Sequence, residues 1–144
     1  MSQDSPQDKE VAIHIAKKWL EASALTATNK QFDEHFNLIS KNVRVTGVPG
    51  FDSISYDDWA RQCKEDFKED LLEGVSYDGS KLLATNENQI MFKTVETIFV
   101  NDGSRKTHGV EILLTQEEDG VWRVTQERVL TDGECVHDGL MKSL

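Results

Sequence analysis

The sequence predicts an α+β domain in which three N-terminal helices pack on a curved, mostly antiparallel sheet. The spacing of apolar residues changes near Gly74, from intervals of three and four before it to alternation after it. Two Asp-Gly pairs, Asp102-Gly103 and Asp119-Gly120, interrupt the alternating half as tight hairpin turns would. The chain has 144 residues, which suits one domain with a single core, and no internal repeat or linker divides it.

The first helix is expected to begin with Ser5 as its cap, Pro6 at the first helical position and Asp8 in the first turn. Its apolar stripe consists of Val11, Ala12, Ile15, Ala16, Trp19, Leu20 and Ala22. A shorter helix follows, in which Phe32, Phe36 and Ile39 share one face. The segment 43–48 then reads as a strand that Pro49-Gly50 closes.

The third helix has a clear start, because Ser55 and Asp58 form a pair that resembles a capping box. Its apolar stripe consists of Tyr56, Trp59, Cys63, Phe67 and Leu71, and Gly74 is its expected stop. On this stripe Cys63 reads as a small buried apolar residue and not as a nucleophile.

Four strands are expected over residues 75–84, 88–100, 106–116 and 121–130, joined by hairpins. Three-residue loops with glycine in the left-handed position would pair Val100 with Ser104 and Glu117 with Val121. These two pairs fix the register and predict the inner face, which comprises Ile90, Phe92, Thr94, Glu96, Ile98, His108, Val110, Ile112, Leu114, Trp122, Val124, Gln126, Arg128 and Leu130.

This inner face carries a small ionisable cluster. Glu96 falls directly opposite His108, and Arg128 falls opposite Val110 on the next strand, with Thr94 and Gln126 close by. Charged groups on an apolar face need partners or a wet pocket. The cluster therefore indicates an acid–base or ligand-orienting site. A salt bridge at the sheet rim, or a register off by one, would also account for it.

The opposite sheet face mixes apolar residues such as Met91, Phe99 and Leu113 with polar ones such as Lys93 and Thr107. A subunit interface has this composition, so a homodimer through the outer sheet face is expected. Sixteen Lys and Arg against 26 Asp and Glu give a net charge of −10 without a basic cluster, which argues against nucleic acid and anionic membranes as partners.

No apolar run reaches the roughly 18 residues of a membrane span, and the polar first ten residues are unlike a signal peptide. Two cysteines, Cys63 and Cys135, are too few for a disulfide scaffold. A cytoplasmic protein is the resulting expectation. The sequence lacks HxH, HExxH and CxxC spacings and a glycine-rich phosphate loop, so neither a metal nor a cofactor is predicted.

The order of elements and one motif resemble a known superfamily. The segment 119–124, Asp-Gly-Val-Trp-Arg-Val, resembles the Asp-Gly-x-Trp-(Lys/Arg)-(Ile/Val) opening of the last strand in NTF2-like proteins, the cone-shaped SnoaL-like and ketosteroid-isomerase-like fold. The resemblance covers residues 6–131 and leaves residues 132–144 as a tail that either packs across the cone opening or hangs free. It implies one domain with a ligand cavity, in a fold that hosts isomerases, dehydratases, cyclases and non-catalytic binders.

The best-known catalytic set of that superfamily is missing. Trp19 stands where ketosteroid isomerases have a tyrosine, and Gly47 stands where they have the aspartate base. An indole lacks the acidic hydroxyl that stabilises an enolate oxygen, and glycine accepts no proton. Ketosteroid isomerisation itself is therefore not expected.

The resemblance and the ionisable cluster together predict a cavity for a small, largely apolar molecule with one polar end. Glu96 or His108 would be the base of an isomerase, dehydratase or cyclase, and Arg128 would stabilise the developing oxyanion. The expected ligand-binding residues are Trp19, His35, Tyr56, Trp59, Thr94 and Gln126, although the aromatic ones could equally be core and His35 a buried residue capped by backbone. The alternative is a non-catalytic binding or dimeric assembly domain.

Overall fold

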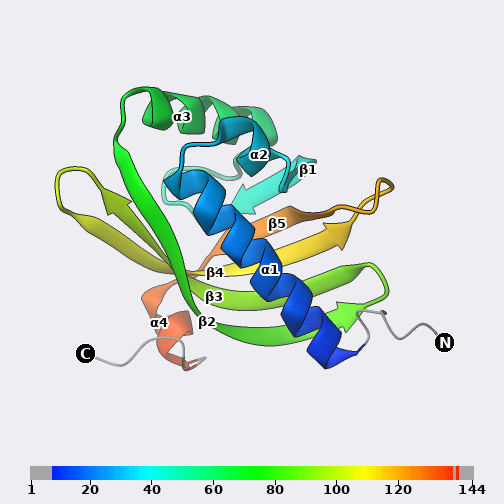
Figure 1. The fold of residues 1–144 in the computed structure, drawn as a ribbon. Coiled ribbons are helices and arrows are strands. Elements are labelled where there is room, and N and C mark those ends of the chain that lie inside the picture. Colours follow the sequence, from blue (N-terminus) through cyan, green and yellow to red (C-terminus); the bar gives the residue numbers. More distant parts are fainter. Residues whose placement is uncertain (1–7, 138, 140–144) are drawn as a thin grey trace.

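A computed structural model describes residues 8–137 and 139 (Figure 1). The elements are α1 (Lys9–Thr28), α2 (Phe32–Phe36), β1 (Ile39–Thr46), α3 (Tyr56–Lys68), β2 (Leu72–Asn86), β3 (Gln89–Val100), β4 (Arg105–Gln116), β5 (Trp122–Val129) and α4 (Asp132–His137). The sheet has the order β1-β5-β4-β3-β2, with β1 parallel to β5 and the other neighbours antiparallel. The predicted α+β class, helices before a curved sheet, is confirmed.

Helix α1 crosses the concave face of the sheet (Figure 1). It begins at Lys9 because Asp8 caps it, its side chain accepting a hydrogen bond from the Glu10 N–H at 2.9 Å. Asp8 is therefore the cap and not part of the first turn, and the expected start at Ser5 and Pro6 lies outside the described residues. The buried face of α1 packs with the inner sheet residues in one core: Ala12, Ala16, Trp19, Leu20, Ile90, Phe92, Val110, Ile112, Leu114 and Val124.

Helix α3 starts as predicted, since the Ser55 hydroxyl accepts a hydrogen bond from the Asp58 N–H. Its predicted end at Gly74 is wrong. The helix stops at Lys68, and Asp70 turns the chain with a φ of 55°. Gly74 instead lies buried within β2, which begins at Leu72. Strand β1 also begins earlier than predicted, at Ile39.

Both predicted hairpins are confirmed. The Val100 N–H donates to the Ser104 carbonyl at 2.9 Å, and the Glu117 N–H donates to the Val121 carbonyl at 3.0 Å. Gly103 and Gly120 both have positive φ angles, as the three-residue loops require. Strands β3 and β4 then run in the predicted register, which places Glu96 directly opposite His108.

A β-bulge in β5 overturns part of the predicted inner face. The pairing is as expected at Leu114 and Val124, but Leu113 then pairs with Gln126, so Thr125 is an extra residue. The Thr125 hydroxyl lies 2.8 Å from the Thr115 hydroxyl and contacts the Leu113 carbonyl. Each β5 residue after Thr125 therefore lies on the face opposite to the predicted one. Gln126 and Arg128 face outward, and Glu127, expected outside, is buried on the inner face opposite Ile112.

Strand β2 is a long edge strand that bends around the end of α1 (Figure 1). Its pairing with β3 shifts at three places, between Leu72 and Gly74, between Asp78 and Ser80, and between Leu82 and Ala84. Bulges bend a strand and increase its twist, and they curve the sheet here into a half-open cone. Gly79, with a φ of 69°, provides the left-handed residue at the middle bulge.

The tail contributes helix α4, whose packing was left open by the sequence. The fully buried Cys135 side chain lies against Gly109 of β4, and the carboxylate of Glu134 binds the Arg128 guanidinium at 2.8 Å. Because Gly109 and Arg128 are on the outer face, α4 covers that face and not the cone opening. Among the described residues, no helix combines the length and apolar character needed to cross a membrane.

Candidate functional site

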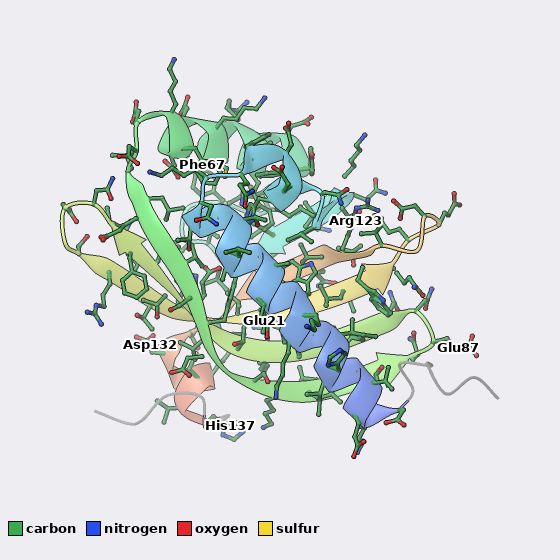
Figure 2. The ribbon with its side chains drawn as sticks, in the orientation of Figure 1. Glu21, Phe67, Glu87, Arg123, Asp132 and His137 are labelled. Atoms are coloured by element: carbon green, nitrogen blue, oxygen red, sulfur yellow. The ribbon has the colours of Figure 1, made fainter. Side chains whose placement is uncertain are left out.

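A cavity of about 240 Å³ lies between the helices and the inner face of the sheet. Helix α3 forms its roof, and Phe67 lies on the side of that helix facing the sheet (Figure 2). The lining is mainly apolar and includes Trp19, Ala27, Ile39, Trp59, Phe67, Leu72, Val75 and Ile98. Its polar side chains are Ser23, His35, Gln62, Asp66, Tyr77, Glu96 and Glu127, together with the Cys63 thiol. The polar side chains therefore come from the helices α1, α2 and α3 as well as from the sheet strands β2, β3 and β5.

Glu96 is the best-connected of these polar groups. The Tyr77 hydroxyl donates to its Oε2 at 3.0 Å, and the Nε2 of His108 lies 2.9 Å from its Oε1. Ser23 of α1 lies 3.2 Å from the same Tyr77 hydroxyl. Burial, followed by the charges of Glu96 and Glu127, raises the pKa of Tyr77 well above its ordinary value, so the phenol remains a hydrogen-bond donor.

Glu127 is the second carboxyl in the cavity. Only 8% of the residue is exposed, and no hydrogen-bond partner for its carboxyl is found among the described residues. Burial, and then the nearby charge of Glu96, raise the pKa of Glu127 from 4.5 to about 8. Two carboxyls that face one low-dielectric space do not both ionise readily, so Glu127 keeps its proton at neutral pH.

His108 connects the carboxyl pair to solvent. It does not line the cavity, and 28% of its side chain is exposed against 15% for Glu96. Glu96 therefore has one carboxyl oxygen bonded to Tyr77 on the cavity wall and the other bonded to a histidine that reaches water. Such a chain of hydrogen bonds can carry a proton between the cavity and bulk water.

Two further side chains in the lining are held electrically neutral. His35 lies 3.0 Å from the Thr26 hydroxyl through its Nδ1, and burial lowers its pKa despite the opposing influence of Glu96. Burial and the neighbouring Asp66 raise the pKa of the Cys63 thiol to about 12. Neither group adds a positive charge or a thiolate to the site. Cys63 is half-buried in the cavity lining and not buried as expected, while its raised pKa agrees with the expectation that it is not a nucleophile.

The structure brings together some of the predicted site residues. Trp19, His35, Trp59 and Glu96 line the cavity, and His108 contacts Glu96 from behind. The indole N–H of Trp19 donates to the Leu38 carbonyl at 3.1 Å. It therefore ties α1 to the start of β1 and is not free to bind an oxyanion.

The other predicted residues lie elsewhere. Arg128 forms ion pairs with Glu111 and Glu134 on the outer face, and Gln126 is exposed, so their predicted inward positions are wrong. Thr94 is buried, but its hydroxyl donates to the carbonyls of Asp78 and Gly79 at the β2 bulge. Tyr56 packs edge-on against Phe36 and is not part of the cavity lining.

Sequence reasoning missed Tyr77 and Glu127. Glu127 was missed because the alternation of β5 placed it on the outer face, and the bulge at Thr125 turns it to the inner face. Tyr77 lies opposite Glu96 on β2, but two register shifts between the hairpin turn and Tyr77 displace it from the position that a simple hairpin count gives. Two observations were nonetheless available in the sequence: Tyr77 is one of two tyrosines in the chain, and it lies on a strand neighbouring Glu96.

Over residues 8–137 and 139, no group of three or more His, Cys, Asp or Glu side chains is placed to hold a metal ion. A larger open groove of about 600 Å³ runs along the outside of α1 and β2, lined by exposed residues such as Lys17, Glu21 and Ser80. Tyr77 forms the boundary between this groove and the cavity. The groove is open to solvent, so the cavity with the carboxyls of Glu96 and Glu127 is the stronger candidate site.

The helices across a bulged, cone-shaped sheet, with an internal cavity, define the NTF2-like fold, which is also described as cystatin-like. Solved structures that resemble this chain include a candidate scytalone dehydratase from Novosphingobium aromaticivorans (TM-score 0.69, 12% identity, 84% of each chain covered). They also include an NTF2-like protein of unknown function from Shewanella oneidensis (TM-score 0.69, 10% identity, 82% of this chain and 98% of that chain).

A third similar structure, from Catenulispora acidiphila, was solved in complex with S-DNPA (TM-score 0.66, 15% identity, 89% of this chain and 98% of that chain). No protein-family model and no curated protein matches the sequence. Identities this low establish the fold alone.

Proposed function

We propose that the cavity binds a small, largely apolar molecule by one polar end and exchanges a proton with it. The observation that carries the proposal is the buried carboxyl pair, in which Glu96 is held by Tyr77 and His108 while Glu127 faces the same cavity without a partner. Enzymes that use acid–base chemistry commonly hold two titratable groups whose surroundings shift their pKa values apart, so that one is protonated while the other is ionised.

In this proposal Glu96 is the proton acceptor and His108 relays the proton to water. The apolar walls hold the carbon skeleton, and Glu127 binds the polar end of the ligand. An isomerase, a dehydratase or a cyclase fits this arrangement, because each moves a proton without an external oxidant. Arg128 has no part in it, since its guanidinium is bound to Glu111 and Glu134 on the outer face.

Two similar structures support the proposal, one of a candidate scytalone dehydratase and one solved in complex with S-DNPA. A second candidate function is a non-catalytic ligand-binding or dimeric assembly domain. It is favoured by the half-buried apolar side chains of Met91, Phe99 and Leu113 on the outer sheet face. In either case we propose a cytoplasmic protein, because two cysteines are too few for a disulfide scaffold, and one that does not bind nucleic acid, because the chain is acidic without a basic cluster.

A thermal-shift screen of small apolar acids, ketones and sterols, followed by deuterium incorporation from D₂O into each hit, tests the proposal. Glu96→Gln should lower the exchange rate by roughly 100-fold or more, because general-base catalysis contributes about 10²–10⁴. The control is Glu118→Gln, which removes an equal charge from an exposed turn. The catalytic proposal fails if Glu96→Gln and the control exchange deuterium equally fast, and the binding proposal fails if no compound raises the melting temperature.

A further inference from the structure

The charges around the cavity are all of one sign. Asp66, Glu96 and Glu127 line it, whereas the lining contains no lysine or arginine among the described residues. The one histidine in the lining, His35, is kept neutral by burial. A carboxylate ligand would therefore meet like charge without a counter-ion, and a cation would meet opposite charge on the same wall.

The apolar walls also suit a cation. Trp19, Trp59 and Phe67 contribute aromatic side chains to the lining. The faces of such rings attract ammonium groups, and the attraction strengthens when water is excluded. Aromatic walls with carboxyls at one end form a binding site for an organic amine, in which the carbon skeleton contacts the rings and the ammonium contacts the carboxyls.

Glu127 distinguishes a ligand site from a merely acidic surface. The residue is 8% exposed and lines the cavity, and no hydrogen bond to its carboxyl is found among the described residues. No fully buried side-chain oxygen among the described residues lacks a hydrogen-bond partner, so the Glu127 carboxyl opens onto the space of the cavity, where a ligand can reach it. An ammonium group has three N–H donors, enough to bond Glu127 and the neighbouring Glu96 together.

We propose that the polar end of the ligand is a protonated amine, bound between the carboxyls of Glu96 and Glu127. This inference rests on the proposed function, because it specifies the ligand class of the same cavity. At 240 Å³ the cavity is smaller than the roughly 300–1,000 Å³ of pockets for drug-sized ligands, so a single ring with a short aminoalkyl chain is the expected size.

Binding of such a ligand is coupled to release of a proton. In the empty cavity Glu127 holds a proton because of its burial and the charge of Glu96. The ammonium offsets that charge, so the Glu127 carboxyl loses its proton to solvent while the amine keeps its own. The other titratable groups that line the same cavity are Glu96 from β3, Tyr77 from β2, His35 from α2, and Cys63 and Asp66 from α3.

Isothermal titration calorimetry with benzylamine, benzyl alcohol and benzoate tests the inference, because these probes share a ring and differ in charge. Titrations at pH 7 and about 0.15 M salt suppress attraction to the acidic surface. We expect benzylamine to bind at least tenfold more tightly than benzyl alcohol and benzoate not to bind. Buffers with different ionisation enthalpies should report release of up to one proton with benzylamine and none with benzyl alcohol.

Glu127→Gln should reduce benzylamine affinity at least tenfold, abolish the proton release and leave benzyl alcohol binding unchanged, whereas Glu118→Gln should alter none of these. Asp66 is half-buried and lines the same cavity, so Asp66→Asn provides a second variant if Glu127→Gln does not fold. It should weaken benzylamine and spare benzyl alcohol.

Tighter binding of the alcohol or of benzoate would overturn the amine inference while leaving the proposed function intact. Binding of none of the three probes would also overturn it, and the proposed function would fall with it only if the wider screen of acids, ketones and sterols gave no hit.

Discussion

The position of Glu127 follows from one extra residue in β5. Without the bulge at Thr125, this carboxyl would lie on the outer face and Gln126 would take its place inside. A carboxyl that is buried without a partner lowers the stability of the fold. Its retention on the wall of a cavity is therefore the strongest single sign that this cavity has a role.

The burial of Glu127 makes stability depend on pH. Between about 4.5 and 8 the unfolded chain releases the Glu127 proton while the folded protein keeps it. The folded state then binds more protons, so the free energy of unfolding falls as the pH rises through this range. The loss is at most about 5 kcal/mol, since one pKa unit corresponds to about 1.4 kcal/mol.

Glu127→Gln should remove this decline, because the amide does not titrate. Urea unfolding at pH 5, 6.5 and 8 would measure it, with Glu118→Gln as the control. The variant should gain stability relative to the natural protein as the pH rises. If the free energy of unfolding fell equally with pH in the natural protein and in Glu127→Gln, the Glu127 carboxyl would be ionised in the folded state.

Gly47 has a backbone role that accounts for its identity. Its φ of 82° is in the left-handed region, and a Cβ atom there would overlap the backbone carbonyl of Val129. Gly120 has the same φ, but nothing lies near its missing side chain. The pair therefore separates the conformational cost of alanine from the steric cost.

Gly120→Ala should destabilise the protein by about 1–2 kcal/mol, as expected for alanine in the left-handed region. Gly47→Ala should cost at least about 2 kcal/mol more, because the β1–β5 contact must also move. Urea unfolding of the two variants measures the difference. Equal losses would show that the approach of β1 to Val129 is looser than the structure has it.

At the scale of elements, helix α4 depends on a glycine in the strand beneath it. An alanine at Gly109 would overlap the Sγ of Cys135, which is fully buried against it. Asp132 and His137 mark the ends of this short helix (Figure 2). The Arg128–Glu134 ion pair holds the same helix from the other side and is partly exposed, so it contributes little by itself.

In a Cys63→Ser background, Gly109→Ala should make Cys135 react with a thiol reagent at least tenfold faster, because α4 separates from the sheet. Arg128→Ala should accelerate the reaction much less. The rate is followed with a chromogenic disulfide. Unchanged protection in Gly109→Ala would contradict the packing described for α4.

Local patterns in the sequence determined some elements and not others. The Ser55 cap and the hairpin glycines act over three or four residues, so the start of α3 and the pairing of Glu96 with His108 could be predicted. The bulge at Thr125 has no comparable local signal. Alternation continues on both sides of it, and a shift of one residue exchanges the two faces. The candidate site was therefore predicted only at Glu96, His108 and the aromatic and histidine residues of the helices.

At the scale of the whole molecule, the outer sheet face is divided. Helix α4 covers the part around Gly109 and Val95, while Met91 and Leu113 remain half-buried beyond it. We expect this remaining part to be the homodimer contact. Light scattering should then give twice the chain mass of 16.3 kDa.

Leu113→Glu should convert the dimer to a monomer at micromolar concentration, because a charge in an apolar interface is left without a partner. Leu25→Glu is the matched control, since Leu25 is 60% exposed on α1, away from this face. A monomeric natural protein, or dissociation in both variants, would contradict the contact.

The parallel pairing of β1 with β5 has a consequence for how the chain reaches this fold. β1 spans residues 39–46, but among the described residues its one neighbour in the sheet is β5, at residues 122–129. Closing so long a loop is entropically slow, and such distant contacts lower folding rates. During synthesis β1, with the apolar side chains of Val43 and Val45, cannot pair in the sheet until residues 122–129 have left the ribosome. The nascent protein is therefore most prone to aggregate just before β5 emerges, and its yield in cells should depend on chaperones more than its final stability would indicate.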